Sequence, residues 1–166
     1  MHVRKATARD APAIAAIIVP IIREAATYTL NPDMSESEAL AYWMGGDKET
    51  FVAEEDGAVL GTYYMRPNQA GGGRHVCNCG YMTHAAAAGR GVARGMCEHS
   101  LEHARARGYR AMQFNFVVST NERAVRLWQS LGFEIVGLAS RVPASNPRVC
   151  RRTCYVPASL SELIQP

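Results

Sequence analysis

The sequence contains no run of about 18 apolar residues, the length that a membrane-spanning helix requires. The first residues, Met-His-Val-Arg-Lys, lead into alternating polar and apolar positions and not into the apolar core of a signal peptide. Internal repeats are missing, and the alanines at 85–88 are the only low-complexity tract. We therefore expect a cytoplasmic protein with no membrane partner.

The sequence also lacks a large excess of charge of either sign, since the formal net charge is +3 over 166 residues. Proteins that bind nucleic acid usually gather basic residues on one stripe or face, whereas here they are scattered, so no nucleic-acid partner is expected. A small positive excess is compatible with an anionic small ligand. The hydrophobic fraction of 48% is typical of a globular protein, and the length suits one domain with a sizeable core.

The five cysteines form no pattern typical of a metal site. An odd number cannot all pair within one chain. Cys77 and Cys79 are two positions apart and Cys150 and Cys154 are four apart, so neither pair has the Cys-x-x-Cys spacing of zinc sites. We expect buried, reduced thiols and no metal.

The pattern of apolar residues predicts interspersed strands and helices, and therefore an α/β domain with a mixed sheet. Asp56-Gly57 between two apolar runs is typical of a hairpin turn. The predicted strands cover residues 2–6, 51–55, 58–65, 75–84, 109–118, 133–142 and 149–156. The predicted helices cover residues 11–26 with a kink or split at Pro20, about 36–44, about 92–107 and about 122–130. Turns are expected at residues 28–33, 67–73 and 143–147.

The stretch from His84 to Met96 reads as the end of a strand, a glycine-rich turn and the first turn of a helix. Glycines at 89, 91 and 95 let the backbone turn sharply and expose N–H groups. The start of a helix adds unpaired N–H groups and a partial positive charge, which together suit a phosphate. Three glycines before a helix can also make a tight turn and nothing more, so this stretch alone leaves a nucleotide, another phosphate or no ligand open.

Two segments give the stretch a more specific meaning. Ala88–Ala93 resembles the pyrophosphate loop of the GCN5-related N-acetyltransferases, (Gln/Arg)-x-x-Gly-x-(Gly/Ala); Gly91 matches, while Ala88 replaces the leading Gln or Arg. Residues 121–133 resemble the same family's Asn-x-x-Ala-x-x-Leu-Tyr…Gly-Phe signature. The resemblance implies a single domain over residues 1–166 with its core at about 2–156. It also implies a mixed, mostly antiparallel sheet with about four helices.

The resemblance implies that acetyl-CoA is the co-substrate and that its acetyl group passes to an amine. The backbone of the loop would bind the pyrophosphate, two arginines would assist, and the end of the preceding strand would pair with the pantetheine arm. The residues implied for the cofactor are Met82, Thr83, Arg90, Gly91, Val92, Ala93, Arg94, Gly95 and Asn121. For the arginines a solvated helix end, and for Asn121 a helix cap alone, are the structural alternatives.

Trp128 is the departure from the family pattern, which often has Tyr at this position to protonate the CoA thiolate. An indole N–H is a poor acid. We keep Trp128 as a candidate catalytic residue that could donate a hydrogen bond, with a core aromatic as the alternative. The general acid would otherwise be another group or water.

A closer likeness links residues 66–68, 75–81 and 114–121 to the fungal acetyltransferases of proline analogues such as azetidine-2-carboxylate. In that group one Asn is implicated in catalysis and a second helps to hold the substrate carboxylate. Asn78 and Asn115 occupy these positions, and Tyr28 and Thr29 are candidates for the substrate pocket. An amide does not titrate, so Asn78 would orient the amine or stabilise the oxyanion.

The predicted activity is N-acetylation of a small amine, such as an amino or imino acid, by direct transfer. His75 and His84 have a suitable intrinsic pKa for base chemistry, but lone histidines at strand ends are more often structural. Alternative acceptors are an aminoglycoside, a polyamine or a protein N-terminus. A third hypothesis is that the protein is a CoA-binding module without enzymatic activity. The resemblance also implies a homodimer.

Overall fold

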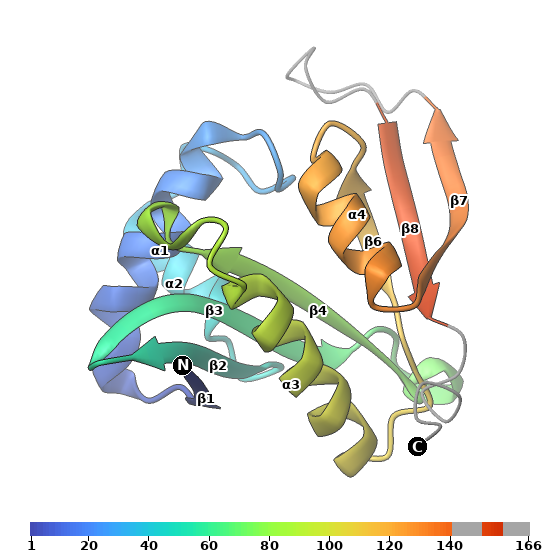
Figure 1. The fold of residues 1–166 in the computed structure, drawn as a ribbon, viewed down its shortest axis with the longest axis horizontal. Coiled ribbons are helices and arrows are strands. Elements are labelled where there is room, and N and C mark those ends of the chain that lie inside the picture. Colours follow the sequence, from blue (N-terminus) through green and yellow to red (C-terminus); the bar gives the residue numbers. More distant parts are fainter. Residues whose placement is uncertain (141–150, 158–166) are drawn as a thin grey trace. The chain divides into compact units, whose positions relative to one another are not determined.

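The computed structural model describes residues 1–140 and 151–157, with side chains described up to residue 137. The strands are β1 His2–Lys5, β2 Glu49–Glu55, β3 Ala58–Pro67, β4 Val76–Thr83, β5 Ala111–Met112, β6 Phe114–Val118, β7 Phe133–Ser140 and β8 Arg151–Pro157 (Figure 1). The α-helices are α1 Ala11–Glu24, α2 Glu36–Trp43, α3 Val92–Ala106 and α4 Glu122–Ser130. The turn predicted at 143–147 and the tail after 157 lie outside the described residues.

Hydrogen bonding arranges the described strands as a five-stranded sheet, β1-β2-β3-β4-β5, and a three-stranded sheet, β6-β8-β7. The pairs β1–β2, β2–β3, β6–β8 and β7–β8 are antiparallel, and β4–β5 is parallel. The expectation of a mixed, mostly antiparallel arrangement with four α-helices is confirmed for this part of the chain.

The strand predicted over residues 109–118 is wrong in one respect, because the structure breaks it at Gln113. Before the break, β5 pairs with β4 through Val76 and Cys77; after it, β6 pairs with β8. Gln113 still donates its N–H to the Cys77 carbonyl (2.8 Å). Its own carbonyl instead accepts a side-chain amide, from Asn78 at 2.8 Å, which ends the strand ladder.

Helix α1 continues through Pro20, so the predicted split does not occur. Its buried residues, which include four isoleucines on both sides of the proline, are Ile14, Ala15, Ile17, Ile18, Val19 and Ile22. Packing of this apolar face outweighs the hydrogen bond that a proline cannot make. The helix ends where Ala25 turns into the left-handed region, with φ +51°.

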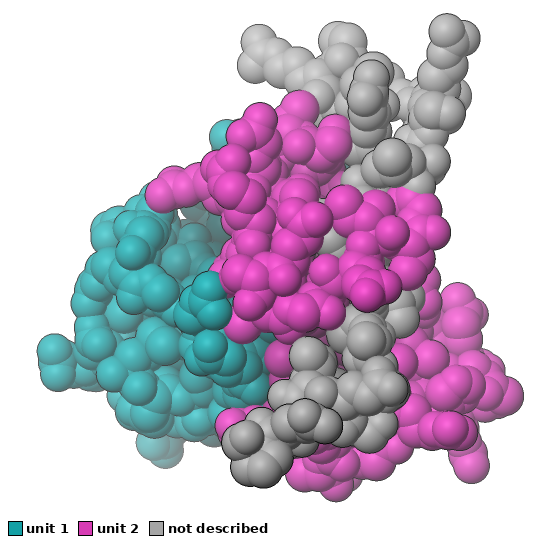
Figure 2. Space-filling model, turned by 45° about the vertical axis from the view of Figure 1, so that its right-hand side comes forward, with its two compact units in different colours: residues 1–25, 29–66, 79–100 teal, residues 26–28, 67–78, 101–166 magenta. Residues whose placement is uncertain are grey.

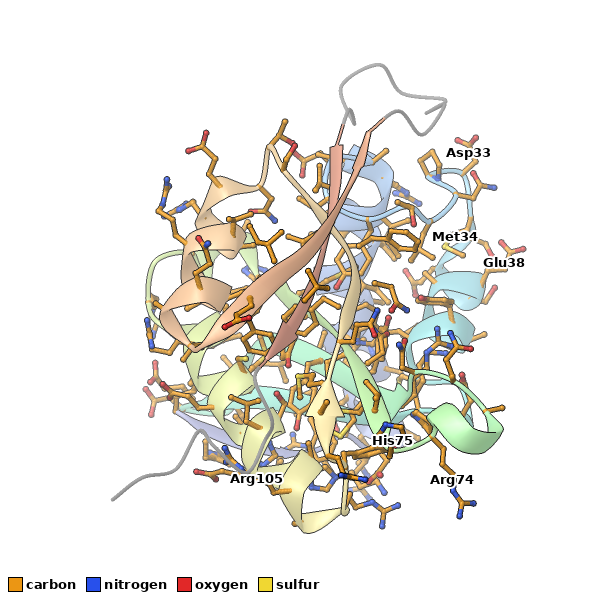
Figure 3. The ribbon with its side chains drawn as sticks, turned by 90° about the vertical axis from the view of Figure 1, so that its right-hand side faces the viewer. Asp33, Met34, Glu38, Arg74, His75 and Arg105 are labelled. Atoms are coloured by element: carbon orange, nitrogen blue, oxygen red, sulfur yellow. The ribbon has the colours of Figure 1, made fainter. Side chains whose placement is uncertain are left out.

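Two local predictions are confirmed by the backbone and the caps. Asp56 and Gly57 have φ of +51° and +78° in the turn between β2 and β3, as a two-residue hairpin turn requires. Ser35 caps α2 by accepting the N–H of Glu38, and Glu38, labelled in Figure 3, reaches back to the Ser35 N–H at 2.7 Å.

The chain forms two compact units, shown in different colours in Figure 2. The first comprises residues 1–25, 29–66 and 79–100, and the second comprises residues 26–28, 67–78 and 101–166. Strand β4 and helix α3 each contribute residues to both units. In the second unit, α4 packs on β7. The expectation of one domain over residues 1–166 stays a prediction.

A partly buried ion-pair cluster ties β1 to the start of α1 within the first unit. Arg4 donates to both carboxylate oxygens of Asp10, at 2.9 and 2.8 Å, and to Glu54 at 2.7 Å. The Thr7 N–H also donates to Asp10, at 2.7 Å. The hydrogen bonds from Arg4, with help from Thr7, hold the pKa of the buried Asp10 carboxyl well below its usual range.

Asp10→Asn should lower the free energy of unfolding at pH 7 by about 2 kcal/mol, the usual worth of hydrogen bonds to a charged group. Since the pKa of Asp10 is lower in the folded state, its contribution is complete above the unfolded-state pKa of about 4 and is lost as the pH falls below that value. Urea denaturation at pH 7, 4 and 3 measures the difference. Asp33→Asn, at a residue labelled in Figure 3 and exposed to solvent, is the control. A difference between wild type and Asp10→Asn that is the same at all three pH values would contradict this prediction.

Candidate functional site

The first turn of α3 packs closely on β3 because residue 61 is a glycine. A Cβ there would lie 2.8 Å from Met96 Cε and 2.9 Å from Val92 Cγ1, closer than real Cβ atoms come. Both helix side chains are buried. Gly61 therefore sets how near the start of α3 lies to the sheet of the first unit.

The loop before α3 has the glycine-rich turn that the sequence predicts. The His84 N–H donates to the Leu60 carbonyl of β3 (2.8 Å), and Gly89 and Gly91 have φ of +80° and +79°. The helix begins directly afterwards, at Val92, so its first N–H groups follow the turn. The expectation from the sequence that Gly95 belongs to this turn is wrong: Gly95 lies within α3 and donates its N–H to the Gly91 carbonyl (3.0 Å).

Arg90 in the loop and Arg94 in the first turn of α3 both have acidic neighbours. Arg90 is half exposed and pairs with Glu55, and Arg94 lies 3.7 Å from Glu98, one helical turn later. Exposed ion pairs of this kind contribute roughly 0–1 kcal/mol. A phosphate could therefore replace these carboxylates at small cost, and the two guanidinium groups suit an anion at the start of α3.

Two further residues predicted for the cofactor lie at the end of β4, in the first unit. Met82 is buried, with 2% of its surface exposed, and Thr83 is half-buried. Together with residues 90–95, they lie on one segment of the chain in which the end of β4, a turn and the start of α3 follow one another. Of the residues predicted for the cofactor, only Asn121 belongs to the second unit.

Asn78 lies on the part of β4 that belongs to the second unit, and 6% of its surface is exposed. Its Nδ2 donates to the carbonyl of Gln113 (2.8 Å). The side chain of Gln113 in turn accepts from Asn68 Nδ2 at 3.3 Å. These three amides, Asn68, Asn78 and Gln113, form a connected group that we call the amide network.

Asn115 lies on β6 at a β-bulge. Phe114 pairs with residue 155 and Val117 with residue 153, so β6 has one residue more than β8 across this interval. Bulges re-aim side chains and are frequent beside active sites. Asn115 is half-buried, and its neighbour Phe116 is 55% exposed.

The two predicted residues of the loop after α1 belong to different units. Tyr28 is half-buried and belongs to the second unit, with Asn78 and Asn115. Thr29 is exposed and belongs to the first. The structure therefore brings Tyr28, but not Thr29, into the compact unit that holds the two asparagines.

Asn121 and Trp128 lie on α4. Asn121 caps the helix, since its Oδ1 accepts the Ala124 N–H at 3.2 Å. Trp128 is 7% exposed, and its ring centroid lies 5.0 Å from that of Phe114 and 6.1 Å from that of Phe133. Helix capping by Asn121 and aromatic packing by Trp128 are therefore both present in the structure. The roles of Asn121 in cofactor binding and of Trp128 in catalysis stay predictions.

Both histidines considered as bases have local hydrogen bonds. His75 Nδ1 is 2.9 Å from the Gly72 carbonyl, so it carries the proton, and His84 Nδ1 accepts the Ala86 N–H at 3.2 Å. His75, labelled in Figure 3, is exposed to solvent. Each histidine therefore has a structural role in its own turn.

Among the residues whose side chains the structure describes, Cys77, Cys79 and Cys97 are buried free thiols. Burial raises the pKa of Cys97 to about 12, so its thiolate is disfavoured. Within the part of the chain that the structure describes, no three His, Cys, Asp or Glu residues gather as metal ligands. None of the described helices combines the length and apolar character needed to cross a membrane.

Comparison with known proteins assigns the family. The model of the acetyltransferase (GNAT) family matches residues 18–133. The chain belongs to this family. The match includes both motifs on which the resemblance rested, and it confirms the expectation of an N-acetyltransferase family and of its fold.

Individual relatives agree with the family assignment. A GCN5-related N-acetyltransferase from Kribbella flavida superposes with a TM-score of 0.86 at 38% identity, over 95% of this chain and 97% of that one. The yncA protein of Salmonella typhimurium, a structure with its cofactor acetyl-CoA, shares the fold with a TM-score of 0.85 at 24% identity, over 100% and 97% of the chains. N-acetyltransferase aca1 of Schizosaccharomyces pombe is 32% identical over 81 residues, which are 49% of this GNAT chain and 39% of that protein.

Sequence reasoning missed Gln113, which lies at the point where the predicted strand breaks. The available signal was weak: Gln113 is a polar residue between the apolar Met112 and Phe114, and Asn115, two positions later, is polar as well. The contacts of Gln113 to Asn68 and Asn78 join positions up to 45 residues apart in the sequence, so no local pattern could reveal them.

Trp128→Ala should lower the free energy of unfolding by about 3–5 kcal/mol because it removes a buried ring that packs against the stacked rings of Phe114 and Phe133. Trp128→Phe keeps an aromatic ring and should cost less than half of this. Chemical denaturation measures both, with Gln129→Ala on the exposed face of α4 as the control. A Trp128→Ala protein as stable as the control would show that Trp128 is not a packing residue.

Proposed function

We propose that this GNAT chain transfers the acetyl group of acetyl-CoA directly to the nitrogen of a small amine, and that the amine is an amino or imino acid. The observation that carries the proposal is the turn at Gly89–Gly91 followed immediately by α3, in a chain of this family. Family membership supports the reaction class. The acceptor is inferred from the asparagines of the second unit and from the likeness to the fungal proline-analogue acetyltransferases.

The donor half of the reaction needs the pyrophosphate of acetyl-CoA to be bound. One helix N-terminus attracts an anion with about 0.3–1 kcal/mol, or about 2 kcal/mol when partly buried, so several N–H groups must act together. Residues 91–93 supply them after the left-handed turn, and Arg90 and Arg94 add charge. The backbone of Met82 and Thr83 would hold the pantetheine arm. The acetyl-CoA in the Salmonella typhimurium structure supports this choice of ligand.

The acceptor half needs a neutral amine beside the thioester. The nitrogen lone pair attacks the thioester carbonyl, the new C–N bond forms, and the C–S bond breaks to release CoA as thiolate. The proton lost by the amine ends on the thiolate or on solvent. Asn78 would orient the amine, Asn115 would bind a substrate carboxylate, and Tyr28 would line the pocket. Trp128 would at most donate a hydrogen bond near the leaving sulfur.

The aca1 relative is a yeast N-acetyltransferase, which supports the reaction class. The likeness of residues 66–68, 75–81 and 114–121 to the fungal proline-analogue acetyltransferases is our reason for proposing an imino acid over an aminoglycoside, a polyamine or a protein N-terminus. A cytoplasmic homodimer is the state that we propose for the enzyme. A CoA-binding module without turnover is the remaining alternative, and Trp128 in place of the family's Tyr is the observation behind it.

Thiol release from acetyl-CoA should rise well above background hydrolysis when the purified full chain is given the right amine. The panel contains amino acids, proline analogues including azetidine-2-carboxylate, polyamines and amine antibiotics. We expect turnover with an amino or imino acid. Turnover with a polyamine or an antibiotic alone would show that the acceptor is not an amino or imino acid. Binding of acetyl-CoA without turnover across the panel would favour a CoA-binding module without activity.

Gly91→Ala should raise the KM for acetyl-CoA about tenfold, equivalent to 1.4 kcal/mol of binding, because a Cβ at residue 91 would project into open space at the turn that we propose binds the pyrophosphate. Gly57→Ala is a matched control: its φ is +78° against +79° for Gly91, and a Cβ at either position meets no atom within 4 Å. The two substitutions therefore carry the same backbone strain. If both raise the KM equally, or neither does, Gly91 does not contact the cofactor.

A further inference from the structure

We propose that Glu55 sets the affinity for the cofactor: its carboxylate pairs with Arg90 before acetyl-CoA binds, and the pyrophosphate of acetyl-CoA displaces it from Arg90. The inference rests on the proposed function, which assigns Arg90 to the pyrophosphate, and goes beyond it by naming the group that competes for Arg90. Glu55 and Arg90 both belong to the first unit.

The pair joins two segments that are distant in the sequence. Glu55 is the last residue of β2, and Arg90 lies 35 positions later in the turn before α3, where its Nη2 donates to Glu55 Oε2. Arg94 and Glu98 differ, because they are one turn apart on α3 and their charged atoms are 3.7 Å apart. Helical spacing alone brings Glu98 near Arg94, whereas Glu55 reaches Arg90 from another element.

A carboxylate and a phosphate are the same kind of partner for a guanidinium group. Each is an anion whose oxygens accept hydrogen bonds from the planar fork of N–H groups. While Glu55 is paired with Arg90, it neutralises the charge that Arg90 offers to a phosphate. The pyrophosphate must therefore compete with Glu55 for Arg90, and this competition lowers the affinity for acetyl-CoA.

The pair can be broken at little cost because both of its side chains are in contact with water. The Arg90 side chain is 51% exposed and that of Glu55 is 33% exposed. Ion pairs of this kind are weak, since water solvates both charges when they separate. The other carboxylate oxygen of Glu55, Oε1, lies 3.2 Å from the Met1 nitrogen. Departure of Arg90 therefore does not leave a buried, unpaired carboxylate.

The backbone around Arg90 is held by hydrogen bonds that do not involve Glu55. The Arg90 N–H donates to the Ala87 carbonyl (3.3 Å), and the Gly95 N–H donates to the Gly91 carbonyl (3.0 Å). The Arg90 side chain can therefore turn away from Glu55 while these backbone groups keep their partners. This favours a competing role for Glu55 over a role in shaping the loop.

The competition acts on product release as well as on binding. CoA carries the same pyrophosphate as acetyl-CoA, so a loop that binds one tightly also binds the other tightly. Product release limits the turnover of many enzymes. When Glu55 pairs with Arg90 again as the pyrophosphate leaves, it stabilises the protein from which CoA has dissociated and so favours release.

Calorimetric titration of the full chain with CoA, at one fixed ionic strength, tests the proposal. Glu55→Gln keeps the shape of the side chain without its charge and should lower the Kd about threefold, as expected for loss of a weak competing pair. Arg90→Gln should raise the Kd about tenfold, because a hydrogen-bonded charge is lost from the site.

Asp56→Asn is the matched control for loss of a nearby negative charge. Asp56 follows Glu55 directly and is exposed, and its φ of +51° is a conformation that Asn adopts readily. At physiological ionic strength its Kd for CoA should stay within about 1.5-fold of wild type, because salt screens exposed charges. A gain as large as that of Glu55→Gln would overturn the proposal.

The double variant decides whether Glu55 acts through Arg90. In the Arg90→Gln background, Glu55→Gln should change the Kd less than about 1.5-fold, because the group for which Glu55 competes is missing. The contact of Glu55 with Met1 is common to both backgrounds and cancels. An equal gain in both backgrounds would overturn the proposal. So would weaker CoA binding by Glu55→Gln, which would show that Glu55 positions Arg90 for the cofactor.

Dephospho-CoA identifies which phosphate displaces Glu55, because it keeps the pyrophosphate and lacks the 3′-phosphate of CoA. We expect Glu55→Gln to lower the Kd for dephospho-CoA by the same factor as for CoA. A gain with CoA that disappears with dephospho-CoA would place Arg90 at the 3′-phosphate and overturn the assignment to the pyrophosphate.

Side-chain NMR of the Arg90 Nε–H group shows the displacement directly. Glu55→Gln should shift this signal in the protein without ligand. With saturating CoA, wild type and Glu55→Gln should give the same signal, because the pair is already broken. A difference that persists with CoA would show that Arg90 binds Glu55 and the phosphate together, which overturns the proposal.

These measurements need no acceptor amine, so they separate failure of this inference from failure of the proposed function. If the expected pattern is seen but no amine gives turnover, the role of Glu55 stands and the acetyl transfer is refuted. If CoA binds wild type and Glu55→Gln with the same Kd, Glu55 does not compete, whatever the activity. If CoA binds neither protein, both proposals are refuted.

Discussion

The short parallel pairing of β4 with β5 is the constraint on which the candidate acceptor residues depend. It covers only Val76 with Ala111 and Cys77 with Met112. Buried backbone groups must find partners, and where the ladder stops, the carbonyl of Gln113 finds one in the side chain of Asn78. A strand that continued beside β4 would satisfy this carbonyl with backbone and would leave the Asn78 amide without its fixed orientation.

The elements that the sequence predicts well are those specified by neighbouring residues. A hairpin at Asp56-Gly57, caps at Ser35 and Asn121, and the turn at Gly89–Gly91 each follow from the steric or hydrogen-bonding properties of a few residues. The break at Gln113 could not be predicted in this way, because apolar residues precede and follow it. Which sheet each half joins is decided by β4 and β8, which are distant in the sequence.

The same distinction applies to the two halves of the candidate site. The predicted donor residues from Met82 to Gly95 are contiguous, so motif and spacing describe nearly all of them. The acceptor residues come from the segments around 28, 68, 78 and 113–115, which the fold brings into one compact unit. A family resemblance could point to Asn78 and Asn115, but the hydrogen bonds that orient Asn78 require the structure.

A group of amides also limits the chemistry that the proposed acceptor site can perform. Asn68, Asn78, Gln113 and Asn115 carry no charge and do not titrate, so they can orient an amine but cannot deprotonate it. His75 and His84 have structural hydrogen bonds in their own turns, and Trp128 packs against the stacked rings of Phe114 and Phe133. On the proposed reaction, these four amides would therefore contribute position and not basicity, and the proton of the amine would have to pass to another group or to water.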